Sequence, residues 1–130
     1  MLKYNTACSG FSVNDLPKAK EFYGKTLGLN IYDDKEMPNL LNLELNGENI
    51  ILIYPKPNHQ PATFTILNFT VNNVEKTVDE LTKLGVKFIV YNDDNFKTNE
   101  KGILHGNEHG PTIAWFNDPA GNILSIIEKS

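Results

Sequence analysis

The 130-residue sequence contains no arginine, and all twelve of its basic residues are lysines. Arg is the side chain best suited to bidentate pairing with phosphate and to reading guanine in DNA. The formal net charge of -4 points the same way, because a polyanionic partner needs a basic surface. We therefore expect no nucleic-acid partner.

Cysteine and long apolar runs are also scarce. Cys8 is the single cysteine, so the chain cannot form an internal disulfide. The first residues lack the apolar stretch of a signal peptide, and no run approaches the roughly 18 consecutive apolar residues of a membrane span. Hydrophobic residues make up 40% and charged residues 22%, as in ordinary globular proteins. These features predict a cytoplasmic protein with no membrane partner.

The chain contains an internal repeat. Residues 11–18, FSVNDLPK, align with residues 69–76, FTVNNVEK, and each copy continues to a Leu-Gly pair. Two similar modules within one domain, residues 1–130, are therefore expected. The predicted bounds are about 5–55 for module one, about 55–61 for a proline-rich linker and about 62–130 for module two.

Each module is predicted to open with a strand that leads into an amphipathic helix. In the first copy Asn14 or Asp15 can cap the helix. In the second copy Asn72, with Glu75 three residues later, resembles a capping box. Alternation and turn residues predict the remaining strands. These are 29–32, 41–45 and 50–54 in module one, and 86–91, 112–116 and 123–127 in module two. The fold class is α+β, a tandem β-α-β-β-β repeat.

The sequence resembles the vicinal oxygen chelate superfamily, which has the glyoxalase, bleomycin-resistance and dioxygenase fold. Residues 11–29, FSVNDLPKAKEFYGKTLGL, are close to that family's opening, and residues 115–122, WFNDPAGN, resemble its closing turn. Segments 54–57, 61–65 and 100–103 resemble a bacterial branch of the family. The resemblance implies an open eight-stranded cup with helices outside and a ligand cavity inside, and a homodimer.

Enzymes of this family hold a divalent metal in the cup with His or Glu on the first strand of each module and Glu on the last strand. Carried over onto this sequence, the three positions are Cys8, Ile66 and Ser125. Ile cannot donate to a metal, and Ser is a poor ligand for a divalent ion. We therefore expect no metal and no cofactor, and we favour binding over catalysis. Cys8 is interpreted as a small buried residue.

A different metal site is conceivable in the long connection over residues 92–111. His105 and His109 flank a carboxylate at Glu108, but the surrounding glycines favour a loop over a helix that would place both imidazoles on one face. Together with Glu128, these histidines could form the displaced site of a metal-dependent lyase, isomerase or dioxygenase. This hypothesis stays open as an alternative.

What remains is a ligand cavity without a reactive group. The candidate ligand-binding residues that strand alternation directs into the cup are Cys8, Ile66, Asn68, Trp115 and Ser125. Trp115 offers a stacking surface or fills the core, and Asn68 can orient a polar group. With no cation among these positions, the lining suits a small neutral or cationic organic molecule, as in bleomycin-sequestering relatives. No catalytic residue is predicted. An interaction module with a cup filled by its own side chains is the third hypothesis.

Overall fold

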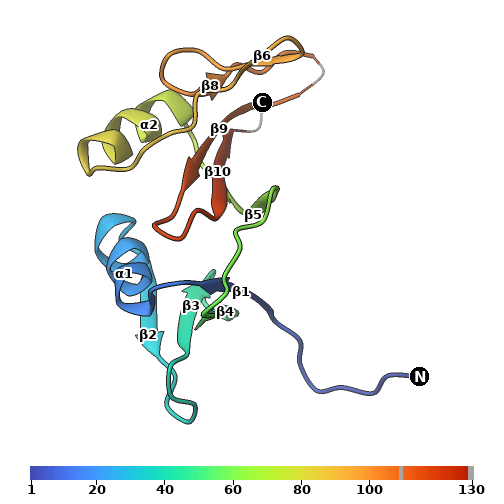
Figure 1. Ribbon diagram of the computed structural model, residues 1–130. Helices are drawn as coiled ribbons and strands as arrows, with labels where there is room; N and C mark the ends of the chain where they lie inside the picture. Colours follow the sequence, from blue (N-terminus) through green and yellow to red (C-terminus); the bar gives the residue numbers. More distant parts are fainter. Residues whose placement is uncertain (109, 129–130) are drawn as a thin grey trace. The chain divides into compact units, whose positions relative to one another are not determined.

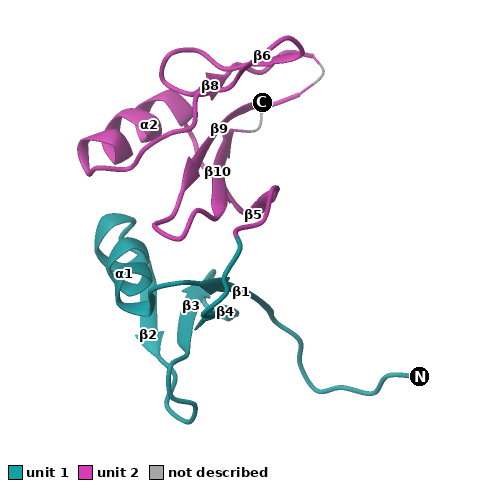
Figure 2. Ribbon diagram, viewed as in Figure 1, with its two compact units in different colours: residues 1–60 teal, residues 61–130 magenta. Residues whose placement is uncertain are grey.

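The computed structural model describes residues 1–108 and 110–128. The chain divides into two compact units, Met1–Gln60 and Pro61–Ser130 (Figure 2). Each unit carries one β-α-β-β-β module (Figure 1). The predicted α+β class is confirmed, and the two modules follow one another in the order that the repeat predicted. Within the described residues, no helix is long and apolar enough to cross a membrane.

Unit one is a four-stranded sheet with a helical segment between its first two strands. Its elements are β1 (Ser9–Val13), α1 (Leu16–Glu21), the π-helix η1 (Phe22–Thr26), β2 (Asn30–Asp33), β3 (Leu41–Leu45) and β4 (Asn49–Pro55). The spatial order is β1-β4-β3-β2, in which β1 is parallel to β4 and the other pairs are antiparallel. Ser12 Oγ lies 2.6 Å from His59 Nδ1, so the segment after β4 is tied back to β1.

The start of the helical segment follows from its capping residue. The Asp15 carboxylate accepts a hydrogen bond of 3.0 Å from the Lys18 N–H and satisfies a donor that the first helical turn leaves unpaired. Pro17 is tolerated in this turn because its missing N–H would have no partner there. The segment ends before Gly28, which has a left-handed φ of +70°. Between these ends the helix widens at η1, and Tyr23 is fully buried there.

Unit two repeats the plan with a longer connection. Its elements are β5 (Thr65–Thr70), α2 (Val74–Lys83), β6 (Asn92–Asp93), β7 (Phe96–Lys97), β8 (Ile103–Leu104), β9 (Thr112–Asn117) and β10 (Ile123–Glu128). The main sheet has the order β5-β10-β9-β8, and β6 pairs with β7 in a small hairpin. β5 is parallel to β10, whereas β10 and β8 are both antiparallel to β9.

Two local predictions for unit two are wrong. The side chain that caps α2 is Asn73, which accepts from the Lys76 N–H at 2.9 Å, and not Asn72. The predicted strand over residues 86–91 is also not formed, and within it Phe88 makes an isolated bridge to Phe116. The Ile89 N–H also donates to the Trp115 carbonyl at 2.8 Å, and the adjoining part of this edge of β9 pairs with the short strand β8 from the long connection. Sharing the edge with β8 limits the pairing of the earlier segment.

The core of each unit lies between its helix and one face of its sheet. The buried apolar residues of the strands occupy alternating positions, as expected for strands with one face against a helix, and the polar Asn42 and Ser125 between them are buried too. In unit one the buried apolar residues are Val13, Ala19, Tyr23, Leu41, Leu43 and Ile53. In unit two they are Val74, Val78, Val86, Ile103, Ala114, Phe116, Leu124 and Ile126. The intervening residues project on the other face of each sheet, and Asn68, Trp115 and the fully buried Ser125 of unit two are among these.

Candidate functional site

Three of the predicted site residues form one row across the sheet of unit two. Ser125 on β10 is paired with Asn68 on β5 and with Trp115 on β9. Directly paired residues of neighbouring strands project on the same side of a sheet. Their strand neighbours Leu124 and Ile126 are buried on the side that α2 covers. The row Asn68–Ser125–Trp115 therefore lies on the face opposite the helix.

Hydrogen bonds organise this row. The Ser125 hydroxyl donates to the side-chain oxygen of Asn68, and Ser125 has no exposed surface. Because its oxygen accepts this bond, the exposed Asn68 amide can direct its NH2 group toward a ligand. The indole N–H of Trp115 donates to the Thr65 hydroxyl at 3.1 Å. The row thus combines an amide oriented by Ser125 with an indole ring oriented by its hydrogen bond to Thr65.

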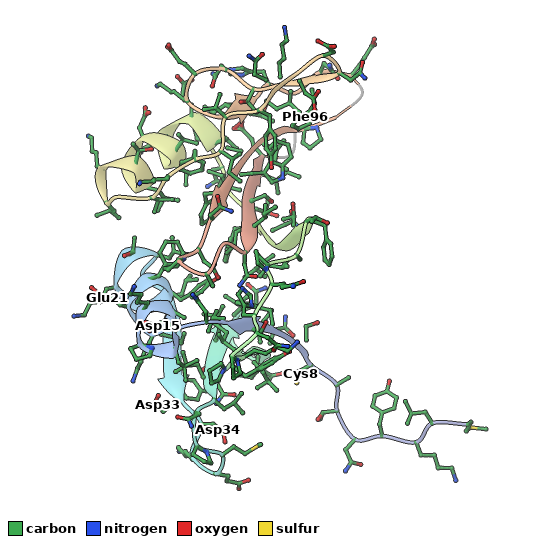
Figure 3. All side chains as sticks on the ribbon, viewed as in Figure 1. Cys8, Asp15, Glu21, Asp33, Asp34 and Phe96 are labelled. Atoms are coloured by element: carbon green, nitrogen blue, oxygen red, sulfur yellow. The ribbon has the colours of Figure 1, made fainter. Side chains whose placement is uncertain are left out.

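Two other rings pack against Trp115. Its ring centroid lies 5.6 Å from that of Tyr91 and 5.2 Å from that of Phe96, and Tyr91 and Phe96 are 5.1 Å apart. Phe96 belongs to the β6–β7 hairpin (Figure 3), so the long connection reaches the predicted site at this ring. All three side chains are half-buried. Trp115 therefore has a packing role and keeps part of its surface available.

Ile66 occupies an irregular position in β5. Thr65 is paired with Ile123 and Leu67 with Leu124, so the register shifts at Ile66, which has no partner on β10. A residue inserted in this way changes which side chains share a face. As a result Thr65, which simple alternation did not select, contacts Trp115. The sequence offers no turn or glycine signal for this irregularity.

Cys8 differs from its prediction. It is exposed, in an exposed segment that runs from Met1 to Gly10, so the interpretation as a buried residue is wrong (Figure 3). The physical reason is its place just before β1, whose buried side chains begin only toward the other end of the strand. Cys8 belongs to unit one, whereas Ile66, Asn68, Trp115 and Ser125 belong to unit two.

The donor set at the positions where the family places its metal ligands does not fit a divalent ion. Ile66 has no donor atom, and the Ser125 hydroxyl is buried and already bonded to Asn68. Within residues 1–108 and 110–128, no three His, Cys, Asp or Glu side chains gather closely enough to hold a metal. His105 is exposed with Nε2 3.4 Å from the Asn99 amide nitrogen, and His109 lies outside the described residues.

Unit one has a polar cavity that sequence reasoning missed. It has a volume of about 440 Å³ and is lined by Tyr32, Asp34, Lys35, Glu36 and Asn42. The Asp34 carboxylate accepts from the Asn42 amide at 2.9 Å and from the Met37 and Glu36 N–H groups at 2.8 and 3.1 Å. The hydrogen bond from Asn42 contributes most to lowering the pKa of Asp34 below its ordinary value, and the two backbone hydrogen bonds lower it further. The Asp34 carboxylate therefore keeps its negative charge to a lower pH than an ordinary Asp would.

The strand register places this cavity on the face of the unit-one sheet that its helix does not cover. Asn42 is paired with Tyr32 and Leu52, and Leu52 with Gly10. The neighbours Leu41 and Leu43 are buried on the other side. The sequence spacing of Asp34 and Asn42 gives no sign that their side chains meet.

Comparisons with known proteins agree with this fold. Residues 7–126 match the family model described as the Glyoxalase/Bleomycin resistance protein/Dioxygenase superfamily. The sequence has no significant match among curated proteins.

Three solved structures illustrate the similarity. The antibiotic binding protein TnmS3 from Streptomyces sp. CB03234 is 22% identical, with a TM-score of 0.65 over 99% of this chain and 100% of the other. The fosfomycin resistance protein FosX from Listeria monocytogenes is 13% identical, with a TM-score of 0.70 over 99% and 96%. A glyoxalase family protein from Enterococcus faecalis is 18% identical, with a TM-score of 0.69 over 95% and 97%.

Proposed function

Because the chain belongs to the glyoxalase/bleomycin resistance protein/dioxygenase superfamily, we propose that it binds a small neutral or cationic organic molecule without the family's metal. The observation that carries the proposal is the Asn68–Ser125–Trp115 row on the helix-free face of unit two. Similar structures include one named as an antibiotic binding protein and one named as a fosfomycin resistance protein. Binding by this fold without catalysis is consistent with the first of these names.

The row supplies the two kinds of contact that small-molecule sites combine. Trp115 offers apolar ring surface, and its tilt is held by Tyr91, Phe96 and the hydrogen bond to Thr65. Asn68 offers a directed amide, held by Ser125. A few positioned polar groups beside aromatic surface are typical of such sites. A planar or heterocyclic ligand with a hydrogen-bond acceptor at its edge fits this pairing.

The charge distribution favours a neutral or cationic ligand. The sequence has no arginine to clamp an anion, and the row itself contains no ionisable side chain. A carboxylate ligand would meet no cation in the row, whereas an amine would meet no repulsion.

We further propose that Cys8 and Ile66 contribute to the lining of the cup that this fold implies, and that the protein is a cytoplasmic homodimer. Size-exclusion chromatography with light scattering measures the oligomeric state. A monomeric mass at concentrations well above those used for binding would contradict the dimer.

A thermal-shift screen with neutral, cationic and anionic heterocycles tests the binding role. We expect ligands of the first two classes to raise the melting temperature progressively, with the logarithm of their concentration once it exceeds the dissociation constant. Asn68→Ala should weaken the response, whereas the control Asn49→Ala, an exposed strand residue of unit one, should leave it unchanged.

Two outcomes would support the alternatives. A stoichiometric divalent ion in protein purified without chelator, lost in His105→Ala, would favour a metal-dependent lyase, isomerase or dioxygenase. No response to any compound would favour an interaction module with a filled cup.

A further inference from the structure

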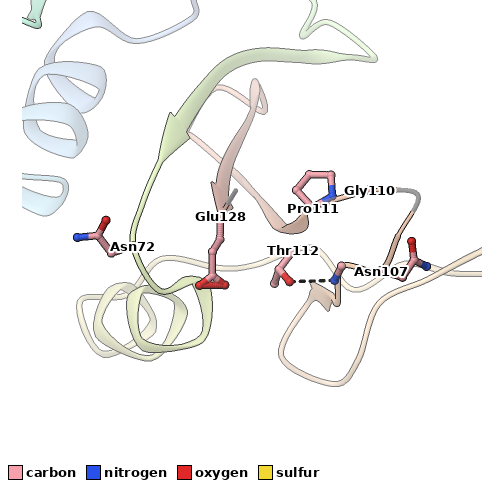
Figure 4. A pocket seen from close by; sticks show the side chains of 7 residues that line it. Asn72, Asn107, Gly110, Pro111, Thr112 and Glu128 are labelled. Atoms are coloured by element: carbon pink, nitrogen blue, oxygen red, sulfur yellow. Dashed lines mark hydrogen bonds between the residues drawn. The ribbon is translucent and has the colours of Figure 1, made fainter. Parts of the chain in front are cut away.

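A second cavity lies in unit two, at the helix-covered side of the sheet. It has a volume of about 460 Å³. Its walls come from three places: Asn72 just before α2, Thr112 and Glu128 at the ends of β9 and β10, and the residues Gly106, Asn107, Gly110 and Pro111 of the long connection (Figure 4).

The strand register separates this cavity from the Asn68–Ser125–Trp115 row. On β10 and β9 the pairs Leu124–Phe116, Ile126–Ala114 and Glu128–Thr112 alternate with the pairs that contain Ser125 and Ile127. The first two pairs are buried on the side of α2. Glu128 and Thr112 continue that row beyond the start of the helix. The cavity is therefore on the opposite face of the sheet from the site proposed above.

One wall is held in place by short backbone contacts. The Gly106 N–H donates to the Thr112 hydroxyl at 2.9 Å, and the Asn107 N–H donates to the Gly110 carbonyl at 2.9 Å. A Cβ at Gly106 would lie 2.7 Å from backbone atoms of Pro111 and Thr112, so this close approach requires glycine. These contacts fix the Gly106 backbone against Thr112 and the Asn107 backbone against Gly110.

Glu128 gives the cavity its charge. The other lining residues carry amide, hydroxyl or apolar side chains, or none. The ion pairs found among the described residues involve Lys20 with Asp33, and Lys101 with Glu75 and Asp79. In residues 1–108 and 110–128, then, no lysine neutralises Glu128. Glu128 is half-buried and lines the cavity, so its carboxylate is the acidic group that a bound molecule would meet.

We propose that this cavity binds a small hydroxyl-bearing organic ammonium compound, such as an amino sugar. The ammonium group pairs with Glu128, and the hydroxyl groups bond to the amides of Asn72 and Asn107. A volume of about 460 Å³ falls within the range of small-molecule sites and is far larger than a single ion needs. A Ca²⁺ ion would need roughly six to eight oxygen ligands, usually including several carboxylates. The residues that line this cavity include one carboxylate, that of Glu128. The proposal is independent of the proposed function.

Glucosamine and N-acetylglucosamine are a matched pair of probes, because acetylation removes the positive charge and leaves the ring hydroxyls. We expect glucosamine, titrated at mildly acidic pH, to shift the backbone amide NMR signals of Gly106, Asn107 and Glu128 in a saturable way. N-acetylglucosamine should bind about tenfold or more weakly, since a charged hydrogen bond is lost.

Glu128→Gln keeps the shape of the side chain and should weaken glucosamine binding by about tenfold or more. Glu80→Gln, which removes an exposed carboxylate on α2, is the matched control and should leave glucosamine binding unchanged. Equal binding of the two sugars to the unmodified protein would overturn the proposal even if Glu128→Gln fails to fold. So would competition in which Mg²⁺ or Ca²⁺ displaces glucosamine stoichiometrically, since it would identify a metal site.

Discussion

The hydrogen bond between Ser125 and Asn68 joins a fully buried hydroxyl to an exposed amide, and this asymmetry predicts unequal effects of removing either partner. Asn68→Ala leaves the Ser125 hydroxyl in the sheet without its acceptor, which should cost about 1–3 kcal/mol of unfolding free energy. Ser125→Ala removes the buried polar group, and the exposed Asn68 oxygen turns to water. That change should cost only about 0.5–1 kcal/mol.

The double variant separates the pair from its surroundings. With both partners removed no unsatisfied group remains, so its stability should be close to that of Ser125→Ala alone. The two substitutions should therefore couple by about 1 kcal/mol or more. Urea unfolding followed by far-ultraviolet circular dichroism on the four proteins gives the cycle. Additivity within about 0.5 kcal/mol, or a larger loss in Ser125→Ala than in Asn68→Ala, would refute the reasoning.

Three further substitutions test other parts of the structure. Phe96→Ala removes ring contacts with Trp115 and should cost about 1–2 kcal/mol in urea unfolding, with a red-shifted Trp115 emission; an unchanged spectrum would contradict the packing. Asp34 has a lowered pKa, so the stability that it contributes is present above its ordinary pKa and is lost as pH falls through the lowered value. Asp34→Ala should therefore flatten the acid limb of a stability-against-pH curve, and an identical limb would count against this. Gly102→Ala should destabilise more than Gly28→Ala by about 1 kcal/mol or more, because only at Gly102 would the added Cβ meet a backbone oxygen, at 2.9 Å. Equal urea midpoints would exclude that contact.

The regular parts of the fold could be predicted because local signals and the final packing agree. The predicted strand over residues 41–45 has the observed bounds, since Leu41 and Leu43 alternate with polar neighbours and both are buried. Asp15 caps its helix as expected, because the carboxylate needs only the backbone three residues ahead. The repeat and the family resemblance then led to the correct superfamily.

The differences arise where the structure depends on contacts distant in sequence. β8 pairs with Ala114 and Ile113 of β9, while Phe88 keeps a bridge to Phe116. This division of one strand edge between two segments depends on both of them and cannot be predicted from either one alone. The irregular register at Ile66 exists only in relation to β10, so Thr65 could not be identified as a neighbour of Trp115. Similarly, Asp34 meets Asn42 only through the turn between β2 and β3.

Fluorescence titration of Trp115 tests most directly the claim that the protein binds an organic molecule without a metal. Trp115 is the single tryptophan, so its emission reports one position. Titration with the ligand that gives the strongest thermal shift should produce a saturable change with one-to-one stoichiometry, identical with and without a chelator. A change that disappears with the chelator and returns with a divalent ion would contradict the account.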